Sequence, residues 1–471
     1  MRPCFADVAW DLLNSARDAY RDTPPVAAAL EHHLERFEGP LRIAVAGPAN
    51  SGKSTLVNAI VGEEVAPVAG DVFTWYQDGQ SPRAIGYPAD GPGRELAGRG
   101  PSWQPPDPDV VEVMVDWPTR TLRHLTLVDT PADAGPTVME YVRREADAVL
   151  YLTPTPSLTP TPSLAPAATG DGATAAVDTI LVLSRADEVG GGRIDALNSA
   201  KLIARRHNRA VEVRELCQHV IALSGLIAYA GRTLREPDFA TLATLAAEPR
   251  TAMEDHLLSV DRFVDARFPV PLSTEIRAGL LDRFGLFGVR LATTLIRTGS
   301  ASPSALSAEL VRRSGLTELR ESISQLFVRR REVLKARSAL LAVESVVRTA
   351  PHPGTRQLAV ELERAWAGAH ELAELRVAAA LRSGRTSLPA GLGEDALRLV
   401  GTHGTGIPAR LGIGENCTAA EAWAVATDTL GRWQEEAENP LYQQDQRRAA
   451  TVVVRTCEGL LTDLAQEVPV A

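Results

Sequence analysis

Short, largely apolar runs recur through the first half of the chain, and their length is typical of buried strands. The clearest are Leu41 to Ala46, Ala148 to Leu152 and Val177 to Leu183. Helical patterns over 55–61 and 194–207 alternate with such runs, which predicts an α/β domain with a mixed, mostly parallel sheet. Further strands are expected at 73–76, 110–115, 122–128 and 218–223, with 110–115 and 122–128 as neighbours that turn at Asp116, Trp117 and Pro118.

The second half of the chain has a different pattern, because its apolar residues recur every three or four positions, as on one face of a helix. We find no convincing strand over 236–471. The pattern predicts an all-α neck and stalk, formed as a helical bundle. Helices are expected at 273–297, about 317–349, 355–382, from a capping box at Thr418 to Glu421 toward Trp433, and about 443–467.

The N-terminal residues 1–38 are also expected to be helical, with an interruption at Pro24 and Pro25. Their apolar stripe needs a partner, so we favour a neck that packs on a distant helical domain over simple padding. We therefore expect neck helices at 1–38, a G domain at 39–235 and a helical neck and stalk domain at 236–471. The stripe consists of Val8, Leu12, Leu13, Ala16 and Tyr20.

The segment from Gly47 to Ser54 has the spacing G-x-x-x-x-G-K-S of a phosphate-binding loop, between a predicted strand and a predicted helix. Backbone N–H groups of such a loop surround a phosphate, and the helix N-terminus adds partial positive charge. Lys53 is expected to reach the β- and γ-phosphates, and the hydroxyl of Ser54 to bind Mg²⁺. The candidate ligands for nucleotide in this loop are Gly47, Asn50, Ser51, Gly52, Lys53, Ser54 and Thr55.

Lysine usage supports this interpretation. The chain has 49 lysine and arginine residues, and the only lysines are Lys53, Lys201 and Lys335. A chain that uses arginine almost everywhere has a lysine where a compact ammonium fits and a planar guanidinium does not. Lys53 and Asn50 are the candidate catalytic residues, although for Asn50 we favour the alternative of a plain loop residue.

Two further segments have the chemistry of a guanine-nucleotide site. Asp129 ends a predicted strand and is followed by Thr130 and Pro131, where P-loop enzymes hold Mg²⁺ through water, so Ser54 and Asp129 are the candidate metal residues. The run from Ser184 to Asp187 also follows a strand. There Asp187 is expected to accept hydrogen bonds from the guanine N1–H and N2–H₂ groups, which adenine lacks, and the stem of Arg185 to lie over the base.

Ser224 and Gly225 match a second loop that cradles the base, but a Ser-Gly pair is also common in ordinary turns. The other two motifs also have an ordinary structural explanation. The run at 184–187 is alternatively a surface loop, and Asp129 is alternatively an aspartate in a turn.

Charge and cysteine content limit the possible functions. The formal net charge is −10, which argues against nucleic acid as a partner. Cys4, Cys217, Cys417 and Cys457 form no CxxC pair, so neither a zinc site nor a disulfide framework is indicated, and a reducing cytoplasm fits. We expect no signal peptide and no transmembrane helix, so that any contact with membrane is peripheral.

Several segments together resemble actinobacterial dynamin-like proteins, and most of all the isoniazid-inducible type of mycobacteria. The resemblance spans about residues 40–345 and implies a GTPase domain on a helical neck and stalk, GTP-driven self-association and peripheral membrane remodelling. The segments are AVAGPANSGKSTLVNAIVGEEVAP, TWY, LVDTP, SRADEVGGGRIDAL, SVDRFV, LLDRFGLFGVR and RRSGLTELRESI.

The chain departs from the family pattern in three places. The interval from Gly62 to Phe73 has no switch-one threonine, which removes one Mg²⁺ ligand and one group that places the attacking water. Ala132 replaces the glycine of Asp-Thr-Pro-Gly and is expected to stiffen switch two. A tandem TPTPSL repeat, within a Pro/Thr-rich insert at 153–175, replaces the usual crossover helix. These departures suggest that nucleotide binding is retained and hydrolysis is weak or lost.

Two segments of the helical half are candidates for lipid contact. The cations Arg329, Arg330, Arg331, Lys335 and Arg337 could face anionic lipid, or form a solvated helix face. The glycine-rich stretch from Gly401 to Gly414 is either a stalk-tip loop or an ordinary connector.

Our leading hypothesis is a dynamin-like protein that binds GTP, GDP and Mg²⁺, hydrolyses GTP weakly, and couples this to self- or hetero-association and membrane remodelling at the inner face of the cytoplasmic membrane. The alternative is a non-hydrolysing pseudo-GTPase scaffold that partners an active dynamin-like paralogue. The acidic charge counts against a third possibility, an RNA-linked GTPase of ribosome assembly.

Overall fold

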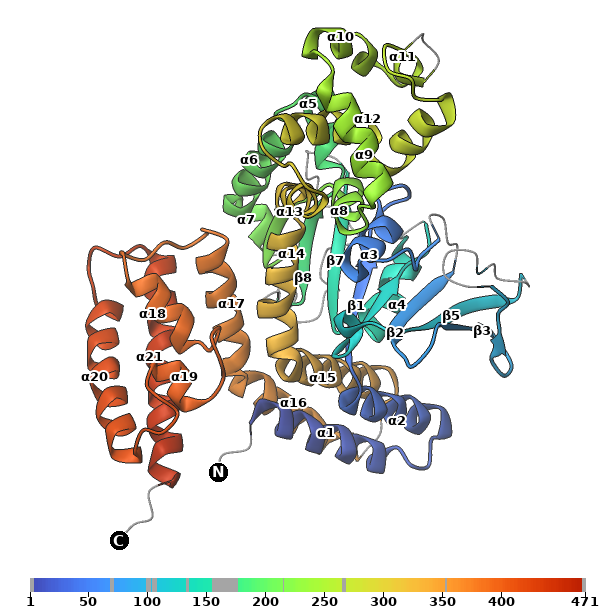
Figure 1. The fold of residues 1–471 in the computed structure, drawn as a ribbon. Coiled ribbons are helices and arrows are strands. Elements are labelled where there is room, and N and C mark those ends of the chain that lie inside the picture. The colour runs from blue at the N-terminus through green and yellow to red at the C-terminus, as the bar shows by residue number, and fades with distance from the viewer. Residues whose placement is uncertain are drawn as a thin grey trace.

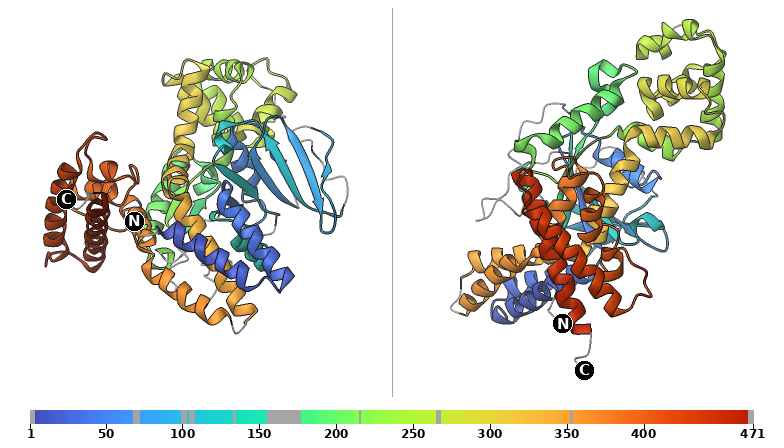
Figure 2. Two further views of the ribbon diagram at one scale, coloured as in Figure 1. Left: turned by 90° about the horizontal axis from the view of Figure 1, so that it is seen from below. Right: turned by 90° about the vertical axis from the view of Figure 1, so that its left-hand side faces the viewer.

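A computed structural model describes residues 4–67, 72–98, 103, 108–132, 135–154, 177–214, 216–264, 268–351 and 354–467. A central sheet has helices on its faces, a group of helices at one end, and a separate C-terminal helical bundle at its side (Figures 1 and 2). Most of the insert expected at 153–175 lies outside the described residues. None of the helices described combines the length and apolarity needed to cross a bilayer.

The sheet has nine strands in the order β4-β3-β5-β2-β6-β1-β7-β8-β9. Parallel pairs join β1 to β6 and β7, β2 to β5, and β8 to β7 and β9, whereas β2–β6, β3–β4 and β3–β5 are antiparallel. The predicted mixed, mostly parallel sheet is therefore confirmed. The strands are β1 (Leu41–Ala46), β2 (Phe73–Asp78), β3 (Arg83–Pro88), β4 (Arg94–Glu95), β5 (Val110–Trp117), β6 (Leu125–Asp129), β7 (Ala148–Thr153), β8 (Thr179–Leu183) and β9 (His219–Ala222).

The prediction that β5 and β6 are neighbours is wrong, because β2 lies between them and pairs with both. The loop after β5 passes over the end of β2 and is anchored there. Gly79 N donates to Trp117 O at 3.2 Å, and Thr119 N donates to Asp78 Oδ1 at 3.2 Å. The expected tight turn at 116–118 is thus a crossing loop. The short strands β3 and β4, which extend the sheet beyond β5, were not predicted.

Helices cover both faces of the sheet, and a further group of helices lies at one end of it (Figure 1). Those nearest the sheet are α3 (Lys53–Val61), α4 (Pro136–Glu145), α5 (Val189–Gly192), α6 (Ala196–Arg209), α7 (Val211–Arg214) and α8 (Gly225–Arg232). The group at the end consists of α9 (Glu236–Ala247), α10 (Arg250–Glu254), α11 (Val260–Val264), α12 (Thr274–Arg297) and α13 (Pro303–Ser314), in which α12 is kinked at Gly285.

The N-terminal helices α1 (Phe5–Ala19) and α2 (Pro24–Glu38) pack on α15 (Arg331–Thr349), and α1 also packs on α16 (Thr355–Gly368). These four helices lie together at the bottom of the molecule in Figure 1. The apolar stripe of α1 is buried there, and Tyr20 Oη donates to Ala350 O at 2.7 Å. The stripe therefore has a distant helical partner, as its pattern predicts.

The single helices expected at 317–349 and 355–382 are both broken. The first consists of α14 (Leu316–Ser322), a π-helical turn at Ile323–Phe327, a short 3₁₀ turn at Val328–Arg330, and α15. The second divides at Ala369 into α16 and α17 (His370–Arg382). The breaks change the direction of the chain, so that α14 contacts α3 while α15 contacts α1 and α2. Apolar residues before and after each break are buried. The helical periodicity therefore continues through the breaks in the sequence.

The C-terminal bundle combines α17 with α18 (Leu392–Leu399), α19 (Ile407–Leu411), α20 (Ala419–Ala437) and α21 (Gln444–Glu467), around a core that includes the fully buried Trp433. The predicted capping box at Thr418 is present. The stretch from Gly401 to Gly414 contains α19, whose Leu411 is buried in the same core. Part of the stretch is therefore packed, as in an ordinary connector, and its contact with lipid stays a prediction.

Both interpretations of the basic segment at 329–337 are wrong for its buried members Arg330, Lys335 and Arg337. Lys335 Nζ donates to the carbonyl oxygens at the end of α2, at 2.7 Å to Arg36 O and 3.0 Å to Phe37 O, and also to Gly39 O. Arg337 pairs with Asp178 beside β8 at 2.7 Å. These cations join α15 to the N-terminal helices and the sheet, where carbonyl and carboxylate oxygens compensate their burial.

Candidate nucleotide-binding site

The loop between β1 and α3 has the backbone that its glycines predict. Gly47 has φ +147°, and a Cβ there would lie 2.4 Å from Leu152 O at the end of β7. Gly52 has φ +91° and immediately precedes α3, and Asn50 also has a positive φ, of 59°. The first N–H groups of α3 therefore face the concave side of a tight loop, as phosphate binding requires.

The ammonium group of Lys53 lies across this loop. Its Nζ donates to Gly47 O at 3.0 Å, Pro48 O at 3.2 Å and Ala132 O at 3.2 Å, and the side chain is buried. The contact with Ala132 connects the loop to the segment after β6. Lys53 therefore places a positive charge between the two segments that would enclose a phosphate.

Ser54 and Asp129 are in direct contact, because Ser54 Oγ donates to Asp129 Oδ2 at 2.6 Å. Asp129 Oδ1 is buried and has no hydrogen-bond partner among the described residues. Burial raises the pKa of Asp129 to about 6, although the hydrogen bond from Ser54 and the charge of Lys53 lower it. A buried carboxylate with an unused oxygen beside a hydroxyl is a donor set that fits Mg²⁺.

Two other buried oxygens in the predicted site also lack partners in the part of the chain that the structure describes. These are Ser51 Oγ in the phosphate loop and Ser184 Oγ directly after β8. Unpaired buried hydroxyls cost stability. Their presence at the ends of parallel strands is the arrangement expected of a site that binds a polar ligand.

The segment from Ser184 to Asp187 lies beside the phosphate loop. Arg185 has φ +53°, its Nε donates to Asn50 O at 2.9 Å, and its Nη1 pairs with Glu188 Oε1 at 2.8 Å. Ala186 N donates to Leu223 O at 3.2 Å, which connects this segment to the end of β9. Asp187 is partly exposed beside them. Arg185 thus bridges the two loops, and Asn50 takes part through its carbonyl oxygen.

Ser224 and Gly225 complete the same edge of the sheet. Ser224 Oγ accepts from Ile227 N at 3.3 Å and so caps α8, and Gly225 lies against Thr55, with 3.6 Å between its ideal Cβ position and Thr55 Cγ2. The structure therefore brings together the predicted residues of the phosphate loop, of the segment after β8 and of the segment after β9. Whether each contacts a nucleotide stays a prediction.

Two residues beside Asp129 were not predicted from the sequence. Thr74 lies opposite Asp129 in the β2–β6 register, so the two side chains share a face of the sheet. Tyr76 lies on the same face, and burial together with the charge of Asp129 raises the pKa of its hydroxyl well above the ordinary value. The only sequence signal was the strand itself, since its pairing with β6 was not foreseen. Residues 68–71 and 133–134 of the two switch segments lie outside the described residues.

The chain is similar to curated proteins of known name. It is 35% identical over 469 residues to the isoniazid-induced protein IniC of Mycobacterium tuberculosis, covering 95% of each chain, and the match is the same in two strains. No protein-family model matches the chain.

Comparison with solved structures finds weaker likenesses. One is to a chain of an oligomerised bacterial dynamin pair described as sensing and tethering membranes, with a TM-score of 0.32 and 13% identity over 98% of this chain and 74% of that one. Another is to LeoA, a bacterial dynamin GTPase from ETEC, with a TM-score of 0.23 and 12% identity over 98% and 94% of the two chains.

Proposed function

Because the chain belongs to the dynamin-like family of the isoniazid-induced protein IniC, we propose that it is a guanine-nucleotide-binding protein. The observation that carries the proposal is the contact between Ser54 and Asp129 at the mouth of the phosphate loop, with Lys53 beside it. This combination of hydroxyl, carboxylate and ammonium suits a nucleotide phosphate bound together with Mg²⁺.

On the phosphate side, Lys53 would exchange its carbonyl partners for β- and γ-phosphate oxygens, and Ser51 Oγ would gain the partner that it lacks. Ser54 and Asp129 would hold Mg²⁺, which, when bound, neutralises charge on the phosphates. On the base side, Asp187 would accept from the guanine edge. Arg185, held by Asn50 O and Glu188, would position the base loop against the phosphate loop.

We propose that hydrolysis is weak. No threonine occurs between Gly62 and Phe73, and Ala132 stands where a glycine would give switch two its mobility. Thr74 is near Asp129 in the sheet, but its hydroxyl donates to Val72 O at 3.4 Å. The chain therefore offers few groups for placing an attacking water, and GTP turnover should be slow in the isolated protein.

The same departures support a second candidate function, a pseudo-GTPase scaffold that binds nucleotide and partners an active paralogue. In both cases we propose that nucleotide occupancy controls self- or hetero-association, at the cytoplasmic face of a membrane. This part rests on the family alone.

A paired measurement tests the proposal. Fluorescent GTP is titrated into the full chain with ATP as competitor, and GTP turnover is measured with and without liposomes. We expect GTP binding that ATP does not displace, and a roughly hundredfold loss of affinity in Asp187→Ala, because charge-assisted hydrogen bonds to the base are lost. Asp195→Ala is the matched control, since Asp195 is exposed and its side chain does not cap α6.

The outcomes separate the two functions. Turnover that rises with liposomes supports a dynamin-type enzyme, and binding without turnover supports the scaffold. Absence of guanine-nucleotide binding, or equal weakening by both aspartate variants, would contradict the proposed site.

A further inference from the structure

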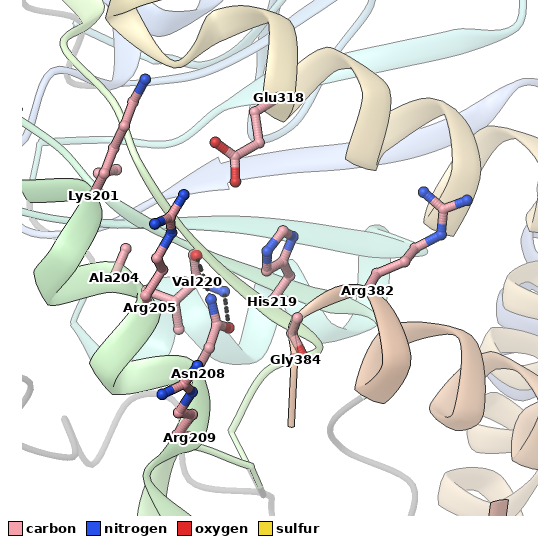
Figure 3. Close-up of a pocket in the computed structure, with 12 residues that line it drawn as sticks. Lys201, Ala204, Arg205, Asn208, Arg209, His219, Val220, Glu318, Arg382 and Gly384 are labelled. Atoms are coloured by element: carbon pink, nitrogen blue, oxygen red, sulfur yellow. Dashed lines mark hydrogen bonds between the residues drawn. The ribbon is translucent and has the colours of Figure 1, made fainter. Parts of the chain in front are cut away.

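A cavity lies away from the phosphate loop, where the C-terminal bundle meets the sheet (Figure 3). Its volume is about 330 Å³. One wall is α6, the floor is the start of β9, and the remaining walls are α14 and the C-terminal end of α17. The cavity is large enough for a small anion or headgroup, at the lower limit of ordinary ligand pockets.

The walls of this cavity are strongly basic in a chain whose net charge is −10. Lys201, Arg205 and Arg209 are spaced by four residues and so lie on one face of α6, and Arg382 lies on the opposite wall. Like charges four residues apart on a helix repel one another. The dipole of α6 favours Arg209, in its last turn, but gives no reason for Lys201 and Arg205.

None of these four cations forms a salt bridge with a carboxylate of the described residues; Arg205 and Arg209 are exposed, and Lys201 and Arg382 are partly buried. Arg382 Nε is in addition a buried donor without a hydrogen-bond partner there. Burial lowers the pKa of Arg382, although Glu321 and Glu394 attract its charge. The guanidinium is therefore partly desolvated and keeps one buried donor free for a ligand.

Glu318 is the one carboxylate that lines the cavity, and it extends from α14 toward Arg205 and His219 (Figure 3). Burial raises the pKa of Glu318 despite the attraction of Lys201 and Arg205. His219 does not add a positive charge, because burial and the nearby Arg385 and Arg382 lower its pKa to about 4. One carboxylate thus lines the cavity beside four cations, while Glu321 and Glu394 act on Arg382 from outside the cavity, and an excess of positive charge is left for a ligand.

We propose that this cavity binds a small anion with two or more phosphate groups, at a site separate from the nucleotide loop. Such an anion would pair with the row of cations on α6 and with Arg382 across the cavity. Because the two walls belong to the sheet domain and to the C-terminal bundle, binding would strengthen the docking of one on the other. Free polyphosphates and phosphorylated lipid headgroups share this chemistry.

Hydrogen–deuterium exchange of the full chain, titrated with inorganic pyrophosphate, tests the site directly. We expect slower exchange in α6 and at the end of α17, separately resolved from any protection at 47–56. In Arg205→Glu and Arg382→Met the concentration needed should rise about tenfold or more, because each removes a charge-assisted contact.

Arg206→Glu is the matched control, because Arg206 lies on the same helix, is exposed and does not line the cavity. Equal weakening in this control, or no protection of α6 and α17 by pyrophosphate or vesicles, would overturn the proposal. Vesicles containing phosphatidylinositol 4-phosphate, whose headgroup carries two phosphate groups, identify the source of the anion. Protection by vesicles that pyrophosphate displaces supports a lipid headgroup, and protection by pyrophosphate alone supports a free anion.

Discussion

The carboxylate of Asp129 in the candidate site lowers the stability of the ligand-free fold. The carboxylate is buried, and its only hydrogen bond in the described structure is from Ser54, so one oxygen is unsatisfied. Its pKa rises from 3.8 to about 6, and the ionised form therefore destabilises the ligand-free fold at neutral pH. A cation in the site would offset this penalty.

We predict that Asp129→Asn stabilises the ligand-free protein at pH 7 by on the order of 2–3 kcal/mol, since each pKa unit corresponds to about 1.4 kcal/mol. The amide keeps the acceptor for Ser54 and removes the buried charge. The same variant should lose Mg²⁺-dependent nucleotide binding. Urea unfolding of both proteins, together with a nucleotide titration, measures the two effects.

The pH dependence gives the sign of the effect. The folded state binds the proton of Asp129 more tightly than the unfolded state, so stability falls as pH rises from about 4 through 6. The difference between the wild type and Asp129→Asn should vanish below about pH 4 and be complete above 6. A variant that is less stable than the wild type at pH 7 would show that the carboxylate has a structural partner.

At the scale of elements, the sequence predicts most strands because buried strands appear as short apolar runs. The runs at 41–46 and 148–152 correspond to β1 and β7 within one residue. The position of β2 between β5 and β6 could not be predicted, because it depends on long-range pairing and on the loop anchored at Asp78. For the same reason Thr74 and Tyr76 were not assigned to the site.

The positions of the helix breaks also could not be predicted from the sequence. Phe327 and Arg330 are compatible with a continuous helix, and both are buried. The backbone leaves the helical region at Arg330, which has φ −114° and ψ 17°, because α14 and α15 pack on different partners. Tertiary packing here overrides local propensity. By contrast, the phosphate loop was predictable, because its glycines and lysine determine its conformation within eight consecutive residues.

The joint between α13 and α14 depends on a close approach to the sheet. Gly315 has φ +93°, and a Cβ there would lie 2.2 Å from Ala222 O at the end of β9. We predict that Gly315→Ala destabilises the protein by more than 2 kcal/mol, about the sum of an unfavourable backbone conformation and a displaced carbonyl. Thermal and urea unfolding measure the loss.

Gly299→Ala is the matched control for that variant. Gly299 has φ +120°, but no atom lies within 4 Å of its ideal Cβ position. It should therefore show only the cost of the backbone conformation, about 1 kcal/mol. Equal losses of stability in the two variants would show that the close contact between Gly315 and β9 adds nothing to the cost of the substitution.

At the scale of the whole molecule, long cationic side chains join the helical parts to the sheet by binding main-chain carbonyls. Lys335 binds the end of α2, and Arg385 connects the C-terminal bundle to the sheet domain. These contacts could not be predicted from the sequence, because the pattern of cations in α15 is typical of an exposed, charged helix face. The Arg385 contact lies beside the proposed anion cavity, because its acceptor Asn208 lines that cavity.

Arg385 gives the sharpest test of how the bundle is docked. Its Nε donates to Asn208 O at 3.0 Å and its Nη2 to Cys217 O at 2.7 Å, between α6 and β9. We predict that Arg385→Met weakens docking by about 1–3 kcal/mol, because charged donors to buried carbonyls are lost. Hydrogen exchange at the end of α6 and at α17 should accelerate, and the radius of gyration should increase. Arg432→Met, which breaks the exposed pair with Asp395 inside the bundle at 2.6 Å, should leave both unchanged. Unchanged exchange in Arg385→Met would mean that the other contacts of the bundle, among them those of Arg329 with Thr402 and Arg330 with Glu374, are sufficient to dock it.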